Sequence, residues 1–451
     1  MSANVEQALR LAEEALAAAV AAGAQEAEVV VSAGSASLTR FAANRIHQNV
    51  SESDAQVSIR AVLGKRSGVA ATNRLDPESL RRCAQAAVAA ASSSQPDESF
   101  PGLPQPTAGA TPAGGPASEA TLRFDETARA TAAATIIGHS SAQGLKAAGG
   151  IAVTDQAVAI ANTHGVRAAA PMAATRATVL SMEDSGGCGW ASFFSADAGG
   201  LDADALGEQA ASLAVRTKNA GTLDPGTYTV VLAPEAVADI VAFMGWMTFG
   251  AKPFAEKRSA FSDKLGESVV DGAISIFDDF AAQGGIGLPF DFEGQPRTPV
   301  TLIKRGIAEG VVTDSMWAAK LGMPNTGHAL PAPNGYGPMP LNLVMDAGDA
   351  TIDDLVSRVD RGVYVTRFHY VNVEDPVPLT LTGMTRDGTF MIEGGRLTKP
   401  LRNLRFTQSA IQALSHVGGI TATRELIGSD GHATLVPGLL LERFAFTGQT
   451  G

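Results

Sequence analysis

Residues 230–241, VVLAPEAVADIV, contain the change of pattern that decides the fold of the second half of the chain. The β-branched run that opens this stretch is typical of a buried strand. Pro234 ends the run and suits the first turn of a helix, because the backbone N–H that proline lacks would have no partner there. The apolar residues that follow recur at helical spacing, so the stretch predicts a strand that leads directly into a helix. Glu235 and Asp239 lie on this helix, and a strand-to-helix junction of this kind is a common place for a metal site.

The residues at the start of the chain predict helices packed on an antiparallel sheet. Residues 4–22 place their apolar side chains on one helical face. Three strand-like runs follow, at residues 27–34, 37–51 and 55–73. Gly64 and Lys65 separate two strand-like halves of the last run, as a two-residue hairpin turn would. Asp76 followed by Pro77 predicts the N-cap and first turn of a second helix that covers the sheet.

The middle of the chain indicates a division into two domains. Residues from about 92 to 120 are rich in Pro, Gly, Ser and Ala without periodicity, which is typical of an exposed loop. Helical patterns then occupy 125–145 and 202–218, and strand patterns occupy about 150–195. Pro and Gly cluster again just before the opening stretch, at residues 220–226. We therefore expect an N-terminal α/β domain over residues 1–222 and a second domain over residues 223–451.

The second domain is predicted to be rich in strands. Strand patterns fill residues 299–312, 361–373 and 378–397. The dipeptides Asp-Gly at 387–388 and Gly-Gly at 394–395 are hairpin signals, which favours a meandering antiparallel or barrel-like sheet. Thr351 with Asp354 predicts a capping box for one short helix, and Thr407 is a candidate N-cap for another. The fold class is therefore α+β, with a twisted sheet and flanking helices followed by a β-rich domain.

Composition limits the partners and the compartment of the chain. Thirty-four Lys and Arg face 46 Asp and Glu, and the net charge of −12 without a basic stripe argues against direct binding of nucleic acid. No uncharged apolar run reaches the length of a membrane span. The first residues lack the basic start of a secretion signal. Cys83 and Cys188 form no ligand pair, which fits a reducing compartment, so we expect a cytoplasmic protein.

The seven histidines never occur in the HxH or HxxxH pairs that would indicate a zinc site in this chain. His328 is the histidine that we favour for function, because it lies in a loop rich in Gly and Pro, and loops of that length are often functional. We expect the same loop to contribute substrate-binding side chains from Asn325, Asn334 and Tyr336. The alternative for His328 is a turn histidine that bonds to the backbone.

Two further motifs suggest catalysis only weakly. Residues 138–142, GHSSA, are close to the GxSxG nucleophile motif, but Ala142 replaces the last glycine and no clean strand precedes the serine. Cys188 in GGCGW lacks a neighbouring basic residue that would lower the pKa of its thiol, so a packed or solvent-facing cysteine is the simpler interpretation. We assign no catalytic residue from either motif.

Several stretches together resemble one family, the TldD/PmbA family, also called modulators of DNA gyrase. They follow the order of the family over nearly the whole chain, and they are FAANRIHQNV (41–50), GKRSGVAATN (64–73), IANTHGV (160–166), LGMPNTGHA (321–329), GVYVTRFHYVN (362–372) and TRDGTFMIEGGRLTKPLRNLRFTQS (385–409). The resemblance implies an N-terminal α/β domain, a β-rich C-terminal domain, and cytoplasmic dimers that enclose a chamber. It also implies one of two kinds of chain: a TldD-like metallopeptidase or a TldE-like chain that pairs with it.

The resemblance places the metal-binding helix of TldD-like chains at residues 234–239 of this sequence. Pro234 then stands at the first histidine, Glu235 at the glutamate and Asp239 at the second histidine. A catalytic zinc needs about three protein donors, and proline offers none. The chain after Ser415 contains no cysteine, so the third ligand of the family is missing as well. We therefore expect no metal and no catalytic residue in this chain, and a zinc-type metal only in a TldD-like partner.

Three hypotheses for function follow. The first is a metal-free, TldE-like subunit that forms part of the substrate chamber of a TldD/TldE-type heterodimer acting on unfolded or modified peptides, with an extended peptide added to a strand edge. The second is a stand-alone homodimer that binds peptides or another small ligand without cleaving them. The third, direct binding to gyrase or DNA, rests only on the older family name, and the charge of −12 argues against DNA.

Overall fold

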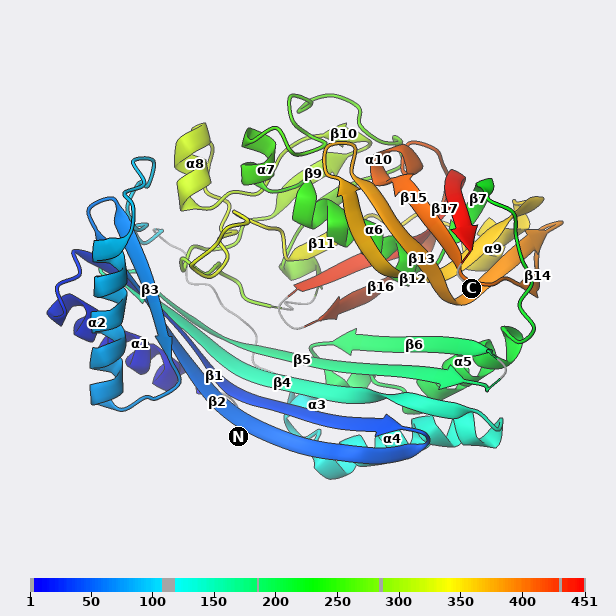
Figure 1. The fold of residues 1–451 in the computed structure, drawn as a ribbon, viewed down its shortest axis with the longest axis horizontal. Coiled ribbons are helices and arrows are strands. Elements are labelled where there is room, and N and C mark those ends of the chain that lie inside the picture. Colours follow the sequence, from blue (N-terminus) through cyan, green and yellow to red (C-terminus); the bar gives the residue numbers. More distant parts are fainter. Residues whose placement is uncertain (1–3, 108–117, 185, 284–286, 430–431, 450–451) are drawn as a thin grey trace.

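The first half of the chain forms a long antiparallel sheet in a computed structural model that describes residues 4–107, 118–184, 186–283, 287–429 and 432–449. Along the sheet the six strands are β3 (Arg66–Thr72), β2 (Arg45–Leu63), β1 (Glu26–Ala42), β4 (Lys146–Asn162), β5 (Arg167–Met182) and β6 (Cys188–Ser195). The helices of this half are α1 (Val5–Ala21), α2 (Pro77–Ser93), α3 (Glu119–Leu122), α4 (Glu126–Ala142) and α5 (Ala203–Arg216). The long curved strands extend below the C-terminal half of the molecule (Figure 1).

The two faces of this sheet have different partners because side chains alternate along a strand. Ala157 and Ala159 of β4 pack with α1 and α2 on one face, whereas Val158 and Ile160 contact the C-terminal half on the other. Farther along the sheet, α4 and α5 cover a second cluster that contains Ile151. The helices therefore leave one face free to support the second half of the chain.

Most local signals of the first half are confirmed, but the predicted breaks between its strand-like runs are wrong. The hairpin at Gly64 and the helix that begins at Pro77 are present, and Asp76 Oδ1 accepts a hydrogen bond from Ser79 N at 2.9 Å. The predicted breaks between the runs 27–34, 37–51 and 55–73 are absent, since β1 continues to Ala42, the chain turns at residues 43–44, and β2 then continues from Arg45 to Leu63. Pairing with β2 on one side and β4 on the other holds this polar segment extended. Residues 108–117 of the predicted loop lie outside the described residues.

The C-terminal half contains a closed ring of five strands. Its members are β7 (Gly226–Leu232), β12 (Arg361–Asp375), β13 (Thr380–Glu393), β15 (Leu404–Ser409) and β17 (His432–Gln449). Strand β7 pairs with β12 on one side and with β17 on the other, which closes the ring. The rings of Phe368, Phe406 and Phe444 lie together in its core, and the centroids of Phe368 and Phe406 are 4.6 Å apart. The predicted barrel-like, β-rich region is thus confirmed.

The other elements of this half extend the barrel on both sides. The strands are β8 (Ile276–Asp278), β9 (Val300–Lys304), β10 (Ile307–Ala308), β11 (Asn342–Met345), β14 (Arg396–Pro400) and β16 (Val417–Ser429). The helices are α6 (Pro234–Met247), α7 (Ala251–Ala255), α8 (Ser315–Leu321), α9 (Ile352–Ser357) and α10 (Ala410–Ala413). In the described part of the chain, no helix combines the length and the hydropathy that crossing a bilayer requires.

Two local predictions for this half are wrong, and two are confirmed. Residues 387–388 lie within β13 instead of forming a hairpin, because Asp387 and Gly388 take up their positive φ angles in an irregular stretch of the pairing with β12. Thr407 stays in β15, and Ser409 caps α10 by accepting from Gln412 N. The turn at 394–395 and the capping box of Thr351 are present.

A loop from the C-terminal half fixes the two halves against each other. Leu288 and Phe290 are buried against Val158 and Ile160 of the N-terminal sheet. Gly294 follows in a left-handed conformation with a φ of 72°, and a Cβ at this position would lie 2.5 Å from Val166 Cγ1. The loop therefore approaches the sheet too closely for any residue with a side chain. The proposed division at residue 222 stays a prediction, although each sheet is built from only one side of it.

Candidate functional site

The junction between β7 and α6 has the predicted shape. Val230 and Val231 end a buried strand, and Pro234 occupies the first turn of α6. Val237, Val241 and other apolar residues of the helix are buried in the main core of the C-terminal half. The junction therefore holds the first turn of α6 rigidly where the barrel faces the N-terminal sheet.

Glu235 is bonded to the N-terminal sheet. Its Oε1 accepts a hydrogen bond from Trp190 Nε1 at 3.3 Å and another from the hydroxyl of Ser192. Both donors belong to β6, the edge strand of the other sheet. The carboxylate at the position of the family's glutamate thus joins the two halves of this chain.

Asp239 lies one turn farther along α6, in a recess that disfavours its charge. Burial raises the pKa of its carboxyl to about 7, and the nearby charge of Glu235 adds to the shift, whereas Arg367 opposes it. Burial and the charge of Glu235 also raise the pKa of Glu425 on β16. Two carboxyl groups beside Glu235 thus have raised pKa values.

Arg367 is already engaged in protein contacts. Its Nε donates to Asp387 Oδ2 at 2.9 Å, and its guanidinium lies 4.1 Å from the centroid of the Trp190 ring. This pairing ties β12 to β13 and to β6. Arg367 thus stabilises the wall beside Glu235.

The donor set at the junction does not fit the metal that the family resemblance implies. Pro234 has no side-chain donor, Glu235 Oε1 accepts from two protein groups, and Asp239 is a carboxyl with a raised pKa. A catalytic zinc is usually held by three donors that include imidazole or thiolate. Within the described ranges, no three His, Cys, Asp or Glu side chains are arranged to hold an ion.

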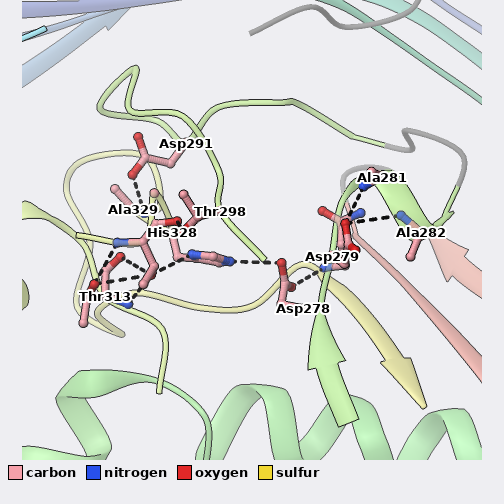
Figure 2. A network of polar contacts seen from close by, with 12 residues as sticks. Asp278, Asp279, Ala281, Ala282, Asp291, Thr298, Thr313, His328 and Ala329 are labelled. Atoms are coloured by element: carbon pink, nitrogen blue, oxygen red, sulfur yellow. Dashed lines mark hydrogen bonds and ion pairs between the residues drawn. The ribbon is translucent and has the colours of Figure 1, made fainter. Parts of the chain in front are cut away.

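His328, which we predicted to be functional, is itself fully buried and belongs to a polar network (Figure 2). Its Nε2 is 3.0 Å from Asp278 Oδ1, and its Nδ1 is 2.9 Å from the hydroxyl of Thr326. Burial lowers the pKa of His328 and outweighs the opposing effect of Asp278, so a neutral imidazole that donates from Nε2 is favoured. Asp278 Oδ2 also accepts from Asn342 N at 2.7 Å. The network joins the predicted loop to the end of β8.

The other residues predicted to bind substrate are spread over the same loop. Asn325 donates to Ser315 Oγ at 3.0 Å and accepts from Gly327 N. Asn334 lines a pocket between the two halves, whereas Tyr336 is 63% exposed beside Trp246. Substrate binding by His328, Asn325, Asn334 and Tyr336 stays a prediction, and the structure does not bring the four side chains to one point.

That pocket, of about 510 Å³, contains side chains that sequence reasoning missed. Glu28 and Arg60 come from paired strands of the N-terminal sheet, and Glu293 and Asp314 come from loops of the C-terminal half. Burial raises the pKa of Glu28 to about 8 and that of Asp314 to about 6. A glutamate inside the strand-like run AEVVV was the only local signal, since such a residue must point to one face of a sheet.

The two weaker motifs do not form catalytic sites. Residues 138–142 are the last residues of α4, so no strand precedes Ser140, whose hydroxyl is 2.7 Å from that of Ser181. Cys188 begins β6, and burial, followed by the charge of Asp387, raises the pKa of its thiol. A raised pKa disfavours the thiolate that a nucleophile requires.

Comparison with known families relates this chain to metallopeptidase domains. Two models of one family match it: the PmbA/TldA metallopeptidase C-terminal domain over residues 225–448 and the PmbA/TldA metallopeptidase domain 1 over residues 27–91. The chain belongs to the PmbA/TldD family.

Curated relatives match the chain over part of its length. A metalloprotease TldD homolog of Haemophilus influenzae is 29% identical over 44% of this chain and 43% of its own length. A metalloprotease of Methanothermobacter thermautotrophicus is 24% identical over 49% of this chain and 48% of its own length. The chain thus spans less than half the length of these two relatives.

Solved structures match almost the whole fold. TldE from Thermococcus kodakarensis aligns with a TM-score of 0.84 over 98% of this chain and 99% of its own, at 18% identity. A Thermotoga maritima protein described as a modulator of a DNA gyrase aligns with a TM-score of 0.80 over 97% and 99%, at 19% identity. At these identities the likeness establishes the fold, which confirms the α+β architecture.

Proposed function

We propose that this chain is the metal-free subunit of a TldD/TldE-type metallopeptidase complex and forms part of the chamber that receives unfolded or modified peptides. The observation that supports this proposal most directly is the partnering of Glu235, whose carboxylate accepts hydrogen bonds from Trp190 and Ser192 of the opposite sheet. A glutamate held in this way supports the chamber wall, and the hydrolytic metal belongs to a TldD-like partner.

The N-terminal sheet offers a place for an extended peptide. Among the described strands β3 is an edge strand, paired only with β2, and its residues 67–69 line the pocket between the two halves. Backbone groups on a strand edge bind an extended peptide with little dependence on its sequence. Such binding suits a complex that acts on many unfolded peptides.

The test is reconstitution from separately purified chains. The isolated chain, a TldD-like metallopeptidase subunit, and their mixture are compared for mass in solution, metal content and hydrolysis of an unfolded peptide. We expect a heterodimer, metal that follows the TldD-like subunit, and hydrolysis that requires that subunit. Hydrolysis by the isolated chain, with a tightly held metal, would overturn the proposal.

Substitutions in each chain make this test sharper. Replacing the metal-ligating histidines of the TldD-like subunit should abolish hydrolysis by the mixture. Asp239→Asn in this chain should leave the rate unchanged, because Asp239 holds no metal in the proposed arrangement. A loss of activity with Asp239→Asn in an intact heterodimer would show that the junction takes part in catalysis.

A stand-alone homodimer that binds peptides is the second candidate. The observation that favours it is that the two halves of a single chain already form a pocket of about 510 Å³ between them. A stable homodimer that binds peptides tightly and forms no complex with the TldD-like subunit would support this candidate over the first.

A further inference from the structure

The pocket between the N-terminal sheet and α8 combines buried carboxylates with aromatic walls. Its volume is about 510 Å³, and the residues that carry the argument are Glu28, Arg60, Phe100, Glu293, Asp314 and Trp317. We propose that this pocket binds a primary ammonium group of a peptide, either its amino terminus or a lysine side chain. The inference rests on the proposed function in one respect, that the chain binds peptides. It does not depend on the partner subunit or on the metal.

Glu28 is the residue that points most clearly to a ligand. It is only 3% exposed, yet its Oε2 has no hydrogen-bond partner among the residues that the structure describes. Its Oε1 lies 3.8 Å from Arg60 Nη1, a distance typical of a loose ion pair. A buried carboxylate oxygen without a donor is costly, so a ligand that brings N–H donors would gain from it.

Glu293 and Asp314 are held in place on the opposite wall. Asp314 Oδ1 caps α8 by accepting from Trp317 N at 2.7 Å, and Glu293 Oε2 accepts from Ser315 N at 3.1 Å. The loop that carries Glu293 is fixed by Asp291, whose Oδ1 accepts from Glu293 N. Asp291 Oδ2 also accepts from Ala329 N (Figure 2). The two carboxylates thus reach the pocket from rigid backbone.

Charge in and behind the pocket is unbalanced. In the described part of the chain, the inner cations near Glu28, Asp291, Glu293 and Asp314 are Arg60 and Arg297. Burial and the charges of Glu293 and Asp291 raise the pKa of Glu28 to about 8, although Arg60 opposes the shift. With this pKa Glu28 is largely protonated at neutral pH, and a bound cation would favour its ionised form.

The remaining charged residues of the lining have other contacts. Lys252 donates to Gly335 O, and Lys320 lies 4.6 Å from the centroid of the Trp317 ring. Glu256 pairs with Arg258. None of these contacts gives Glu28 a donor.

An ammonium group fits this environment better than a metal ion. The carboxylates line different walls, and no three of the described His, Cys, Asp and Glu side chains are placed to hold an ion. An ammonium carries three N–H donors that can reach separate acceptors, and charge-assisted hydrogen bonds to carboxylates are the strong ones. Residues 67–69 of the edge strand β3 also line the pocket, so a peptide bound along that edge can place its ammonium there.

The experiment measures the affinity of the isolated full chain for matched fluorescent peptides of one extended sequence. One peptide has a free amino terminus and no lysine, a second is acetylated and has one lysine, and a third is acetylated with norleucine in place of that lysine. We expect the third to bind about tenfold or more weakly than at least one of the others. The peptide that keeps its affinity identifies the source of the ammonium.

Glu28→Gln should remove that preference, since it keeps the shape of the side chain and removes its charge. Glu208→Gln on the exposed face of α5 is the matched control and should leave it intact. Thermal unfolding of both variants shows whether they are folded, and Glu293→Gln provides a second test within the pocket.

Equal affinity for all three peptides, or no peptide binding at all, would overturn the proposal, as would a preference that survives in folded Glu28→Gln. The outcome is separate from that of the proposed complex. Formation of a heterodimer without any ammonium preference would overturn only the pocket, and an ammonium preference without a heterodimer would overturn only the complex.

Discussion

Acidic side chains lie between the N-terminal and C-terminal halves of the chain in two places, at the junction of residues 230–241 and in the pocket at Glu28, and their surroundings differ. At the junction, Glu235 accepts hydrogen bonds from Trp190 and Ser192. In the pocket, Glu28 is more deeply buried, but its Oε2 has no donor in the described residues. Glu235, which the family resemblance places in the metal-binding helix, thus links the two halves of the chain. Glu28, which no family motif marks, keeps an oxygen that can still accept a hydrogen bond from a ligand.

The contrast indicates that the hydrogen-bond partners of an acidic side chain predict its role better than its residue type does. A buried side chain whose hydrogen bonds are made stabilises the fold. Removing it leaves its partner without a hydrogen bond, which lowers the stability. Carboxyl groups whose pKa is raised destabilise the folded chain when they ionise, so neutral replacements should stabilise it. Substitutions in the two classes should therefore have opposite signs, and each of the following predictions can break that rule.

The largest loss of stability is expected for His328→Ala, because it leaves Asp278 buried without its partner. Asp278 is 1% exposed, and His328 is fully buried beside it. Leaving a buried polar group without its hydrogen-bond donor typically costs about 1 to 3 kcal/mol, more for a charged group, and the cavity left by the imidazole adds to the loss. Urea unfolding of the variant measures the loss, with His47→Ala on an exposed part of β2 as the control within about 0.5 kcal/mol. A loss equal to that of the control would show that Asp278 does not depend on His328.

Asp239→Asn is expected to increase the stability of the folded chain at high pH. The pKa of Asp239 is about 7 in the folded chain, above its ordinary value, so the folded state binds more protons between the two values. Stability from this group is present at low pH and is lost as the pH rises from about 4 through 7. The variant cannot ionise and should be more stable than the wild type by about 2 to 4 kcal/mol at pH 8, with little difference near pH 4.

Unfolding of Asp239→Asn and wild type at several pH values gives the measurement. Asp224→Asn, at an exposed position before β7, is the control and should show no comparable gain. A constant difference between Asp239→Asn and wild type across this pH range would contradict the raised pKa.

Glu235→Ala should lower the free energy of unfolding by about 1 to 3 kcal/mol, since Trp190 and Ser192 lose their common acceptor. Glu235→Gln keeps an acceptor oxygen and should cost less. Glu208→Ala, exposed on α5, should be nearly neutral. Removing the charge of Glu235 should also lower the pKa of Asp239, which weakens the pH dependence described above. If Glu235→Ala is as neutral as Glu208→Ala, the tie does not stabilise the chain.

Sequence patterns predicted features whose causes are local. Asp76 and Thr351 cap helices as expected, because a cap needs only a few neighbouring residues. The Asp-Gly signal at 387–388 failed because β13 continues through these two residues as an irregular stretch of its pairing with β12. Thr407 lost its capping role to Ser409 because β15 continues in pairing with β13. Tertiary pairing overrode the local preference in both cases.

The candidate sites divide in the same way, into one that depends on neighbouring residues and one that depends on tertiary contacts. The missing imidazole at Pro234 is visible in the sequence, because the metal-binding pattern is local. The pocket joins Glu28 to Glu293 and Asp314, which are far apart in the chain and meet only when the two halves pack together. No spacing rule connects them, so only the folded chain reveals their proximity.

The smallest effect on stability is expected for Tyr336→Ala, and it tests whether the predicted loop contributes to binding. Tyr336 is 63% exposed and contacts Trp246, so its removal should change the free energy of unfolding by less than about 0.5 kcal/mol. If the ring packs against a bound peptide, affinity should fall by roughly three- to tenfold, as for other aromatic contacts. Tyr370→Ala provides a matched control, since Tyr370 is 72% exposed on β12 and lies outside the predicted loop. Equal affinities for the two variants would remove Tyr336 from the binding surface and leave the pocket at Glu28 as the place where this chain recognises a peptide.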